Sequence, residues 1–138
     1  MTKRTVFITG GASGIGFGIA QAMSKAGHHV IIADINEQAA QSALPDLLKG
    51  QKVDVLINNA GIQHVSRIED FPPEKWQQLI NIMLVGPALL TQAFLPNMRE
   101  QNFGRIINVG SIHSLVASPY KSAYVAAKHG LLGFAKTI

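Results

Sequence analysis

The feature that most constrains this chain is a glycine-rich turn between a short apolar segment and an amphipathic one. Residues 6–8 are Val-Phe-Ile, glycines follow at 10, 14 and 16, and apolar residues then recur at helical spacing over 15–26. A strand that leads through such a turn into a helix lets a phosphate approach the backbone at the helix N-terminus. The residues predicted to line a dinucleotide here are Gly10, Ser13, Gly14, Ile15 and Gly16, and an ordinary strand-to-helix turn without a ligand is the alternative.

Apolar runs and helical patterns alternate along the rest of the chain. Strands are predicted over 30–33, 53–57 and 105–109, and loops over 61–72 and 111–119. Helices are predicted over 36–49 with an interruption at Pro45, over 73–98 with a kink at Pro87, and from Ser122 to the end of the chain. We therefore expect one α/β domain over 1–138, with a parallel sheet of four strands and helices on both faces.

Asp34 closes the second predicted strand, 24 residues after Gly10. A carboxylate at this place can accept hydrogen bonds from the ribose hydroxyls of an adenosine, although a solvated aspartate at a strand end is the alternative. The same carboxylate would repel a 2′-phosphate, and neither residue 35 nor residue 36 is basic. The sequence therefore favours NAD over NADP as the cofactor.

Composition argues against several other classes of function. The net charge is +4, but the basic residues form no block, so nucleic-acid binding is not expected. No uninterrupted apolar run reaches the ~18 residues of a membrane span, and there is no pattern of a signal peptide. The chain has no cysteine, and its five histidines form no cluster with metal-ligand spacing. We expect a cytoplasmic protein without a metal, a nucleic-acid partner or a membrane partner.

Four motifs together resemble the classical short-chain dehydrogenase/reductase family. They are the glycine-rich turn, Asn-Asn-Ala-Gly at 58–61, Ser111, and Tyr124 followed four residues later by Lys128. The resemblance covers nearly the whole chain and implies a Rossmann-like, doubly wound sheet with its four strands in the order 2-1-3-4. It also implies a Ser-Tyr-Lys oxidoreductase centre with Ser111, Tyr124 and Lys128 as catalytic residues. It also implies that the cofactor contacts Asn58, Ala60, Gly61, Tyr124 and Lys128.

Within that family, the residues around 61–65 and 119–130 are similar to those of bacterial D-3-hydroxybutyrate dehydrogenases. This resemblance implies a short hydroxy acid, (R)-3-hydroxybutyrate, as the substrate. Its carboxylate would be held by side chains at the positions of Gln63, His113 and Lys121, beside Ser111 and Tyr124. An amide, an imidazole and an ammonium are suitable donors for a carboxylate, whereas each of these residues alone is more often simply solvated.

The sequence departs from the family pattern in three places. Met83 stands where the family often has a catalytic asparagine, and Asn81 points about 200° elsewhere on a helix. The stretch between Asp34 and Val53 is shorter than the family's, with a join expected near Ala43–Pro45 and its connecting helix on the sheet face opposite 15–26. The chain also stops at Ile138, inside the expected catalytic helix.

These departures leave a second hypothesis open. The chain could be an internally shortened and truncated relative that binds nucleotide, or associates with a full-length relative, with impaired catalysis. A homo-oligomer formed through the helices over 73–98 and 122–138 is a further possibility, which the resemblance implies and the sequence does not decide.

Overall fold

The computed structural model describes residues 2–34 and 52–138, which belong to two compact units. Unit 1 comprises Met1–Ala60 and Thr91–Ile107, and unit 2 comprises Gly61–Leu90 and Asn108–Ile138. The described elements are β1 (Thr5–Thr9), α1 (Gly14–Lys25), β2 (His29–Ala33), β3 (Val55–Asn58), α4 (Pro73–Ile80), the π-helical turn η1 (Asn81–Val85), α5 (Gly86–Glu100), β4 (Arg105–Asn108), the 3-10 turn η2 (Ile112–Ser114) and α6 (Ser122–Ala135). That the whole chain acts as one nucleotide-binding domain stays a prediction.

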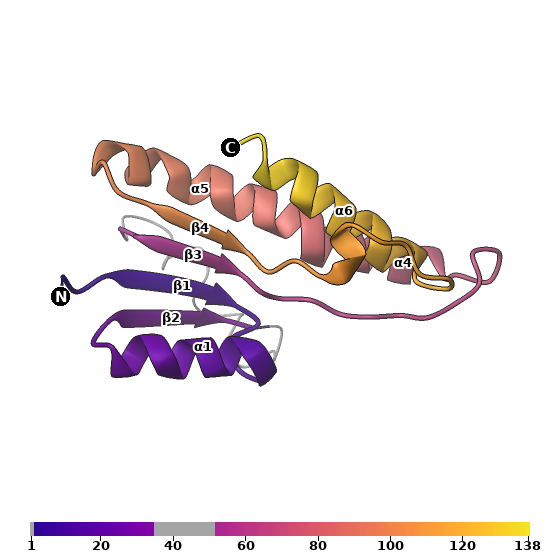
Figure 1. The fold of residues 1–138 in the computed structure, drawn as a ribbon, viewed down its shortest axis with the longest axis horizontal. Helices are drawn as coiled ribbons and strands as arrows, with labels where there is room; N and C mark the ends of the chain where they lie inside the picture. The colour runs from indigo at the N-terminus through magenta and orange to yellow at the C-terminus, as the bar shows by residue number, and fades with distance from the viewer. Residues whose placement is uncertain (1, 35–51) are drawn as a thin grey trace. The chain divides into compact units, whose positions relative to one another are not determined.

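The strands form a four-stranded sheet in the order β2-β1-β3-β4, as the sequence predicts. β1 pairs in parallel with both of its neighbours, with Phe7 opposite Ile31 on one side and opposite Leu56 on the other. Figure 1 shows all four arrowheads pointing the same way. The carboxyl ends of the strands, where such sheets bind ligands, therefore lie at one edge.

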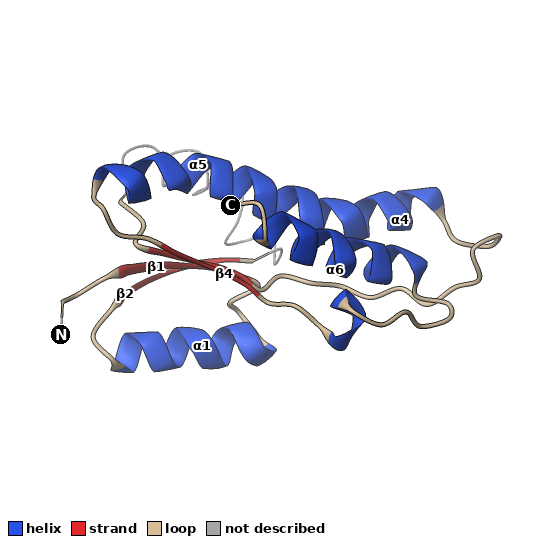
Figure 2. Cartoon of the chain, turned by 45° about the horizontal axis from the view of Figure 1, so that its top comes forward, coloured by secondary structure: helices blue, strands red, loops and turns tan. Residues whose placement is uncertain are grey.

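Unit 1 has helices on both faces of the sheet, so the predicted doubly wound α/β class is confirmed (Figure 2). Helix α1 packs against β1 and β2. On the other face, the ring of Phe94 in the second half of α5 contacts the ring of Phe7, with centroids 5.2 Å apart. The central strands are buried on both faces, which is why β1 and β3 read as continuous apolar runs.

Unit 2 is a helical layer whose core lies between α4, η1 and α6. Leu79 and Met83 pack there against Ala123 and Ala127, with Phe71 closing one end of the cluster. The small alanines let α6 approach α4 closely. The disturbance predicted at Pro87 takes the form of the π-helical turn just before it, where the Gly86 N–H donates to the carbonyl of Asn81. Pro87 has no N–H with which to continue the regular ladder.

The predicted element boundaries hold to within a few residues. Helix α6 ends at Ala135 rather than at the chain end, and β3 begins at Val55 rather than at Val53. Gly27 ends α1 as expected, with a φ of +86° that glycine adopts without strain. The helix predicted over 36–49, its interruption at Pro45 and the sheet face that it covers lie outside the described residues.

The continuous helical segment Pro73–Glu100 is long and apolar enough to cross a membrane by length and composition alone. The segment contains polar residues, so it has no uninterrupted apolar run of that length. A core helix passes the same test, and Leu79, Met83, Phe94 and Met98 of this segment are buried. The segment is therefore weak evidence for a membrane, and the absence of a membrane partner stays a prediction.

Candidate active site

The glycine-rich turn is held in unit 1 by contacts that leave no room for a side chain. Gly10 has a φ of +65°, and a Cβ there would lie 2.9 Å from the Cα of Ala60. At Gly16 a Cβ would lie only 2.1 Å from the carbonyl oxygen of Gly10 and 2.5 Å from the Asn59 amide nitrogen. Both glycines are therefore required by the packing of the turn against the end of β3.

The outer side of the same turn is open. Gly14 has a φ of +54° and would place a Cβ in empty space, and Ser13 and Ile15 beside it are exposed. The first backbone bond of α1 runs from the Phe17 N–H to the Ser13 carbonyl, and Ser13 makes no side-chain cap. The N–H groups of the first turn are thus available at the positive end of the helix dipole, where a phosphate is stabilised.

Asp34 also takes part in this turn. Its Oδ2 accepts a hydrogen bond from the backbone N–H of Ala12 at 2.9 Å, so the carboxylate at the end of β2 steadies the loop that would hold a pyrophosphate. A ribose contact or a solvated side chain was expected at this position, and the bond to Ala12 is an additional role of the carboxylate. The carboxylate sits beside the turn, half-buried, which keeps a negative charge on that side of the candidate cofactor site.

Thr9 and Asn59 are positioning residues to which the sequence pattern assigned no role of their own. The Asn59 Nδ2 donates to the carbonyls of Thr9 and Gly10, both at 3.1 Å. The Thr9 hydroxyl accepts from the backbone N–H groups of Asn59 (3.0 Å) and Ala60 (3.1 Å). These bonds tie the glycine-rich turn to the segment after β3, where Asn58 is buried and Ala60 closes on Gly10. The Asn-Asn-Ala-Gly motif was the available signal.

Unit 2 brings Tyr124 and Lys128 together on one face of α6, as their spacing of four residues predicts. The Lys128 Nζ lies 5.7 Å from the centroid of the Tyr124 ring and donates to the Val109 carbonyl at 2.6 Å. Lys128 is only 4% exposed, and burial lowers the pKa of its ammonium group below the ordinary value. The amine is therefore held in one place by a carbonyl bond and by its buried surroundings.

Ser111 and His113 lie on the short segment after β4, also in unit 2. The Ser111 Oγ accepts from the His113 backbone N–H at 3.2 Å, and the Ser111 N–H donates to the Ser114 hydroxyl at 3.1 Å. This reciprocal cap uses only the oxygen lone pairs of Ser111, so its hydroxyl proton can still be donated to a substrate oxygen. The rings of His113 and Tyr124 meet edge to face, with centroids 6.0 Å apart.

Two predicted substrate residues and one predicted cofactor residue are less firmly placed in unit 2. The Gln63 side chain is exposed and accepts a local bond from the His64 N–H. Lys121 lies at the N-cap of α6, and its side chain makes no hydrogen bond or ion pair with residues 2–34 or 52–138. Gly61 is exposed at the start of the loop. Among the residues that the structure describes, no hydrogen bond, ion pair or ring contact links the side chains of Gln63 and Lys121 to Tyr124.

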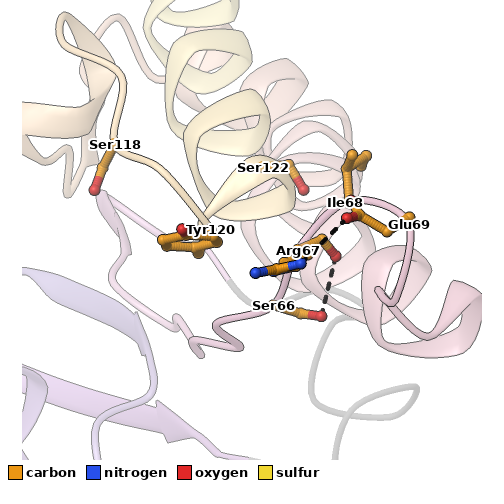
Figure 3. A pocket seen from close by; sticks show the side chains of 7 residues that line it. All are labelled: Ser66, Arg67, Ile68, Glu69, Ser118, Tyr120 and Ser122. Carbon is orange, nitrogen blue, oxygen red and sulfur yellow. Dashed lines mark hydrogen bonds and ion pairs between the residues drawn. The ribbon is translucent and has the colours of Figure 1, made fainter.

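A pocket of about 430 Å³ lies between two loops of unit 2 (Figure 3). The backbone N–H of Ser66 donates to the Tyr120 carbonyl and so joins these loops. Tyr120 and Ser122, which flank Lys121 in the chain, both line it. None of the lining residues was predicted as a site residue; they are Ser66, Arg67, Ile68, Glu69, Ser118, Tyr120 and Ser122.

Met83 occupies the core of unit 2 rather than a polar site. It lies in η1, is 1% exposed and packs with Leu79 and Ala127. Asn81 accepts a bond from Gln77 on the exposed side of the helix, in agreement with its expected direction. A thioether has no proton to relay, so the residues of unit 2 offer no amide at this position.

The described part of the chain contains no group of three or more His, Asp or Glu side chains that could hold a metal ion. His113 and His129 instead use their Nδ1 atoms for bonds with backbone carbonyls. The absence of a metal from the protein stays a prediction.

Comparison with known proteins points to one family. The family model described as short chain dehydrogenase matches residues 4–49 and 46–138. A D-beta-hydroxybutyrate dehydrogenase of Cupriavidus necator is 42% identical over 164 aligned positions, which cover 99% of this chain and 64% of that protein. One of Rhizobium meliloti is 38% identical and covers 100% and 65%, respectively. The chain thus spans slightly less than two thirds of these relatives.

Solved structures agree with the sequence comparison. A 4-hydroxyisoleucine dehydrogenase complexed with NADH and succinate has a TM-score of 0.84 and 29% identity, with 96% of this chain and 70% of that chain covered. A short-chain dehydrogenase from Streptomyces avermitilis has a TM-score of 0.85 and 28% identity, with 99% and 59% covered. The family match comes in two segments that meet at 46–49, and the 164 aligned positions exceed the 138 residues of this chain. The expected internal shortening is thereby confirmed.

Proposed function

Because the chain belongs to the short-chain dehydrogenase family, we propose that it is an NAD-dependent oxidoreductase that converts (R)-3-hydroxybutyrate to acetoacetate. The observation that carries this proposal is the buried Lys128 amine placed 5.7 Å from the Tyr124 ring on α6. The named activity of the Cupriavidus necator and Rhizobium meliloti relatives supports the choice of substrate.

In the proposed reaction, Tyr124 removes the proton of the substrate hydroxyl. A phenol is a weak base at neutral pH because it titrates near pH 10, and a nearby cation favours the phenolate. Lys128 supplies this cation, and its bond to the Val109 carbonyl keeps it in place. The Ser111 hydroxyl donates a hydrogen bond to the substrate oxygen and keeps its proton. The bound dinucleotide supplies a nicotinamide that accepts the hydride.

The residues of the glycine-rich turn fit a dinucleotide. Gly10 and Gly16 fix a tight backbone, and the open side at Gly14 leaves space beside free N–H groups of α1. The two solved structures of 4-hydroxyisoleucine dehydrogenase are complexes with NADH, which supports a nicotinamide dinucleotide as cofactor. Asp34 supports NAD in preference to NADP, since its carboxylate would repel a 2′-phosphate.

The substrate carboxylate is assigned to Gln63, His113 and Lys121. His113 is the best supported of the three, because its ring contacts Tyr124. Lys121 has a side chain without a partner among the residues that the structure describes, and it lies three residues before Tyr124. The complex of 4-hydroxyisoleucine dehydrogenase with NADH and succinate, in which a structural relative is bound to a small dicarboxylate, supports this assignment.

The proposal is tested by mixing purified protein with (R)-3-hydroxybutyrate and NAD and recording the absorbance of NADH. We expect turnover that falls at least about 100-fold in Tyr124→Phe, since this change removes the proposed base. Tyr120→Phe, which alters an exposed phenol four residues earlier, is the matched control and retains activity. (S)-3-Hydroxybutyrate and NADP serve as the mismatched substrate and cofactor.

A second measurement separates catalysis from binding. NADH should raise the melting temperature more than NADPH does, because a ligand stabilises the state that it binds. A melting shift without turnover would instead support the nucleotide-binding, catalytically impaired chain that the sequence left open. Well-folded protein with neither effect would reject both functions.

A further inference from the structure

The ring of His113 has one nitrogen already committed. Its Nδ1 lies 3.0 Å from the Val116 carbonyl oxygen. A carbonyl oxygen can only accept, so the proton of this bond belongs to Nδ1. The ring also stands edge to face against Tyr124, and this contact places it beside the proposed catalytic base. Only Nε2 therefore remains for a ligand.

This bond determines what Nε2 can do. A neutral imidazole carries one proton, and with Nδ1 protonated its Nε2 is an acceptor. A substrate carboxylate is also an acceptor, so the two cannot form a hydrogen bond with each other. They can do so only when the ring takes up a second proton and becomes an imidazolium, for which both nitrogens are donors.

We propose that binding of the anionic substrate is coupled to the uptake of one proton from solvent by His113, with the Val116 carbonyl as the cause of the coupling. This inference rests on the proposed function, because it concerns the carboxylate of that substrate. The family resemblance implies only that His113 donates a hydrogen bond to the substrate carboxylate. The inference adds that the ring must be positively charged to do so.

The charges around His113 support the coupling. Helix α6, which packs against η2, carries Lys121, Lys128 and the phenol of Tyr124, as well as His129 on its exposed side. Residues 108–138 contain no Asp or Glu. Loop 61–72, which bonds to the Tyr120 carbonyl through the Ser66 N–H, carries His64, Arg67, Glu69 and Asp70 as its titratable groups. Arg67 and Glu69 form an exposed ion pair at 3.9 Å. A second proton on His113 therefore adds to the positive charge of Lys121 and Lys128, and the carboxylate of a bound substrate would offset this charge.

The tautomer can be tested without any activity. Nitrogen-15 NMR of the histidine rings of the ligand-free protein at pH 8 should show His113 with a protonated Nδ1 and a bare Nε2, assigned by comparison with His113→Gln. His129 is an internal reference, because its Nδ1 also bonds to a backbone carbonyl, that of Val125 at 2.9 Å. A protonated Nε2 and bare Nδ1 on His113 would overturn the proposal.

The coupling is tested with butyrate, an unreactive carboxylate of the same chain length, in the presence of NAD. Calorimetric titrations at pH 8 in buffers of different ionisation enthalpy should show uptake of about one proton per butyrate bound. The dissociation constant should rise with pH between 7 and 9, because each butyrate bound takes up a proton. His129→Gln should behave like the parent protein.

His113→Gln sharpens the result, because its amide nitrogen is a neutral donor at the place of Nε2. This variant should bind butyrate without proton uptake and with no dependence on pH between 7 and 9. Butyrate binding without proton uptake in the parent protein would overturn the coupling and leave the proposed function intact. A failure of butyrate and of (R)-3-hydroxybutyrate to bind would overturn both.

Discussion

The glycine-rich turn of unit 1 and the α6 site of unit 2 are held in place by different means. In the turn, backbone approaches backbone so closely that Gly16 admits no Cβ. In unit 2, long side chains reach backbone carbonyls, with Lys128 bonded to Val109 and His113 to Val116. The close backbone approach in the turn can be recognised in the sequence, because only glycine permits it. The side-chain bonds of unit 2 depend on which carbonyl the fold brings near.

The largest effect is expected from adding one methyl group to the turn. Gly16→Ala would place a Cβ against the Gly10 carbonyl, so the free energy of unfolding should fall by about 3 kcal/mol or more. Gly18→Ala is the matched control on the same helix, where a Cβ meets nothing within 4 Å, and it should raise stability by about 0.5–1 kcal/mol. Urea denaturation measures both. Equal stability of the two variants would show that the turn yields to the methyl group.

The next effect concerns the amide that ties the turn to β3. Asn59→Ala leaves the carbonyls of Thr9 and Gly10 without this donor, so stability should fall by about 2 kcal/mol and the melting shift produced by NADH should shrink. Asn81→Ala, which removes only an exposed bond with Gln77, should change stability by less than about 0.5 kcal/mol. A similar loss in both variants would remove the special role of Asn59.

Much of unit 1 could be predicted from the sequence, because close packing of backbone against backbone requires glycine at particular positions. Short apolar runs, the glycine spacing and Gly27 specify β1, α1 and their junction locally, whereas the order β2-β1-β3-β4 was expected from the family resemblance. The bond from Ala12 to Asp34 could not be predicted, because it joins residues 22 apart through tertiary structure.

Unit 2 was predictable in its helices and less so in its site. The spacing of Tyr124 and Lys128 on a helix is a local property, and the structure confirms their shared face. The burial of Lys128, the carbonyl partners and the pocket beside Tyr120 depend on how loops fold over α6. The sequence pattern placed Met83 where the family often has a catalytic asparagine. The packing of Met83 with Leu79 and Ala127 shows why an apolar side chain is accommodated there.

Lys128→Met tests how the burial of this amine affects the stability of the protein. The folded-state pKa of Lys128 is lowered by burial, so the unfolded chain binds more protons between that value and the ordinary 10.5. Stability of the parent protein should therefore rise with pH through this alkaline window, whereas that of the variant should not. At neutral pH we expect a stability change within about 1 kcal/mol, because the relief of desolvation offsets the lost bond to Val109.

Turnover of Lys128→Met should nevertheless fall at least about 100-fold, since the cation beside Tyr124 is gone. Lys136→Met, at the exposed end of the same helix, is the control for both readouts and should leave the alkaline rise and turnover unchanged. Loss of the alkaline rise in the control would assign it to a group other than Lys128.

The smallest effect compares the two residues other than glycine that adopt a positive φ in the described ranges 2–34 and 52–138. Asn102 in unit 1 has a φ of 55° just after α5, and asparagine tolerates this conformation. Tyr120 in unit 2 has a φ of 63°, which is costly for a bulky side chain, and it lines the pocket next to Lys121. Tyr120→Asn should raise stability by about 0.5 kcal/mol and Asn102→Tyr should lower it by about 1 kcal/mol.

If the strain at Tyr120 serves to orient Lys121, Tyr120→Asn should also raise the KM for (R)-3-hydroxybutyrate with little change in kcat. A rise in stability with an unchanged KM would limit Tyr120 to shaping the loop.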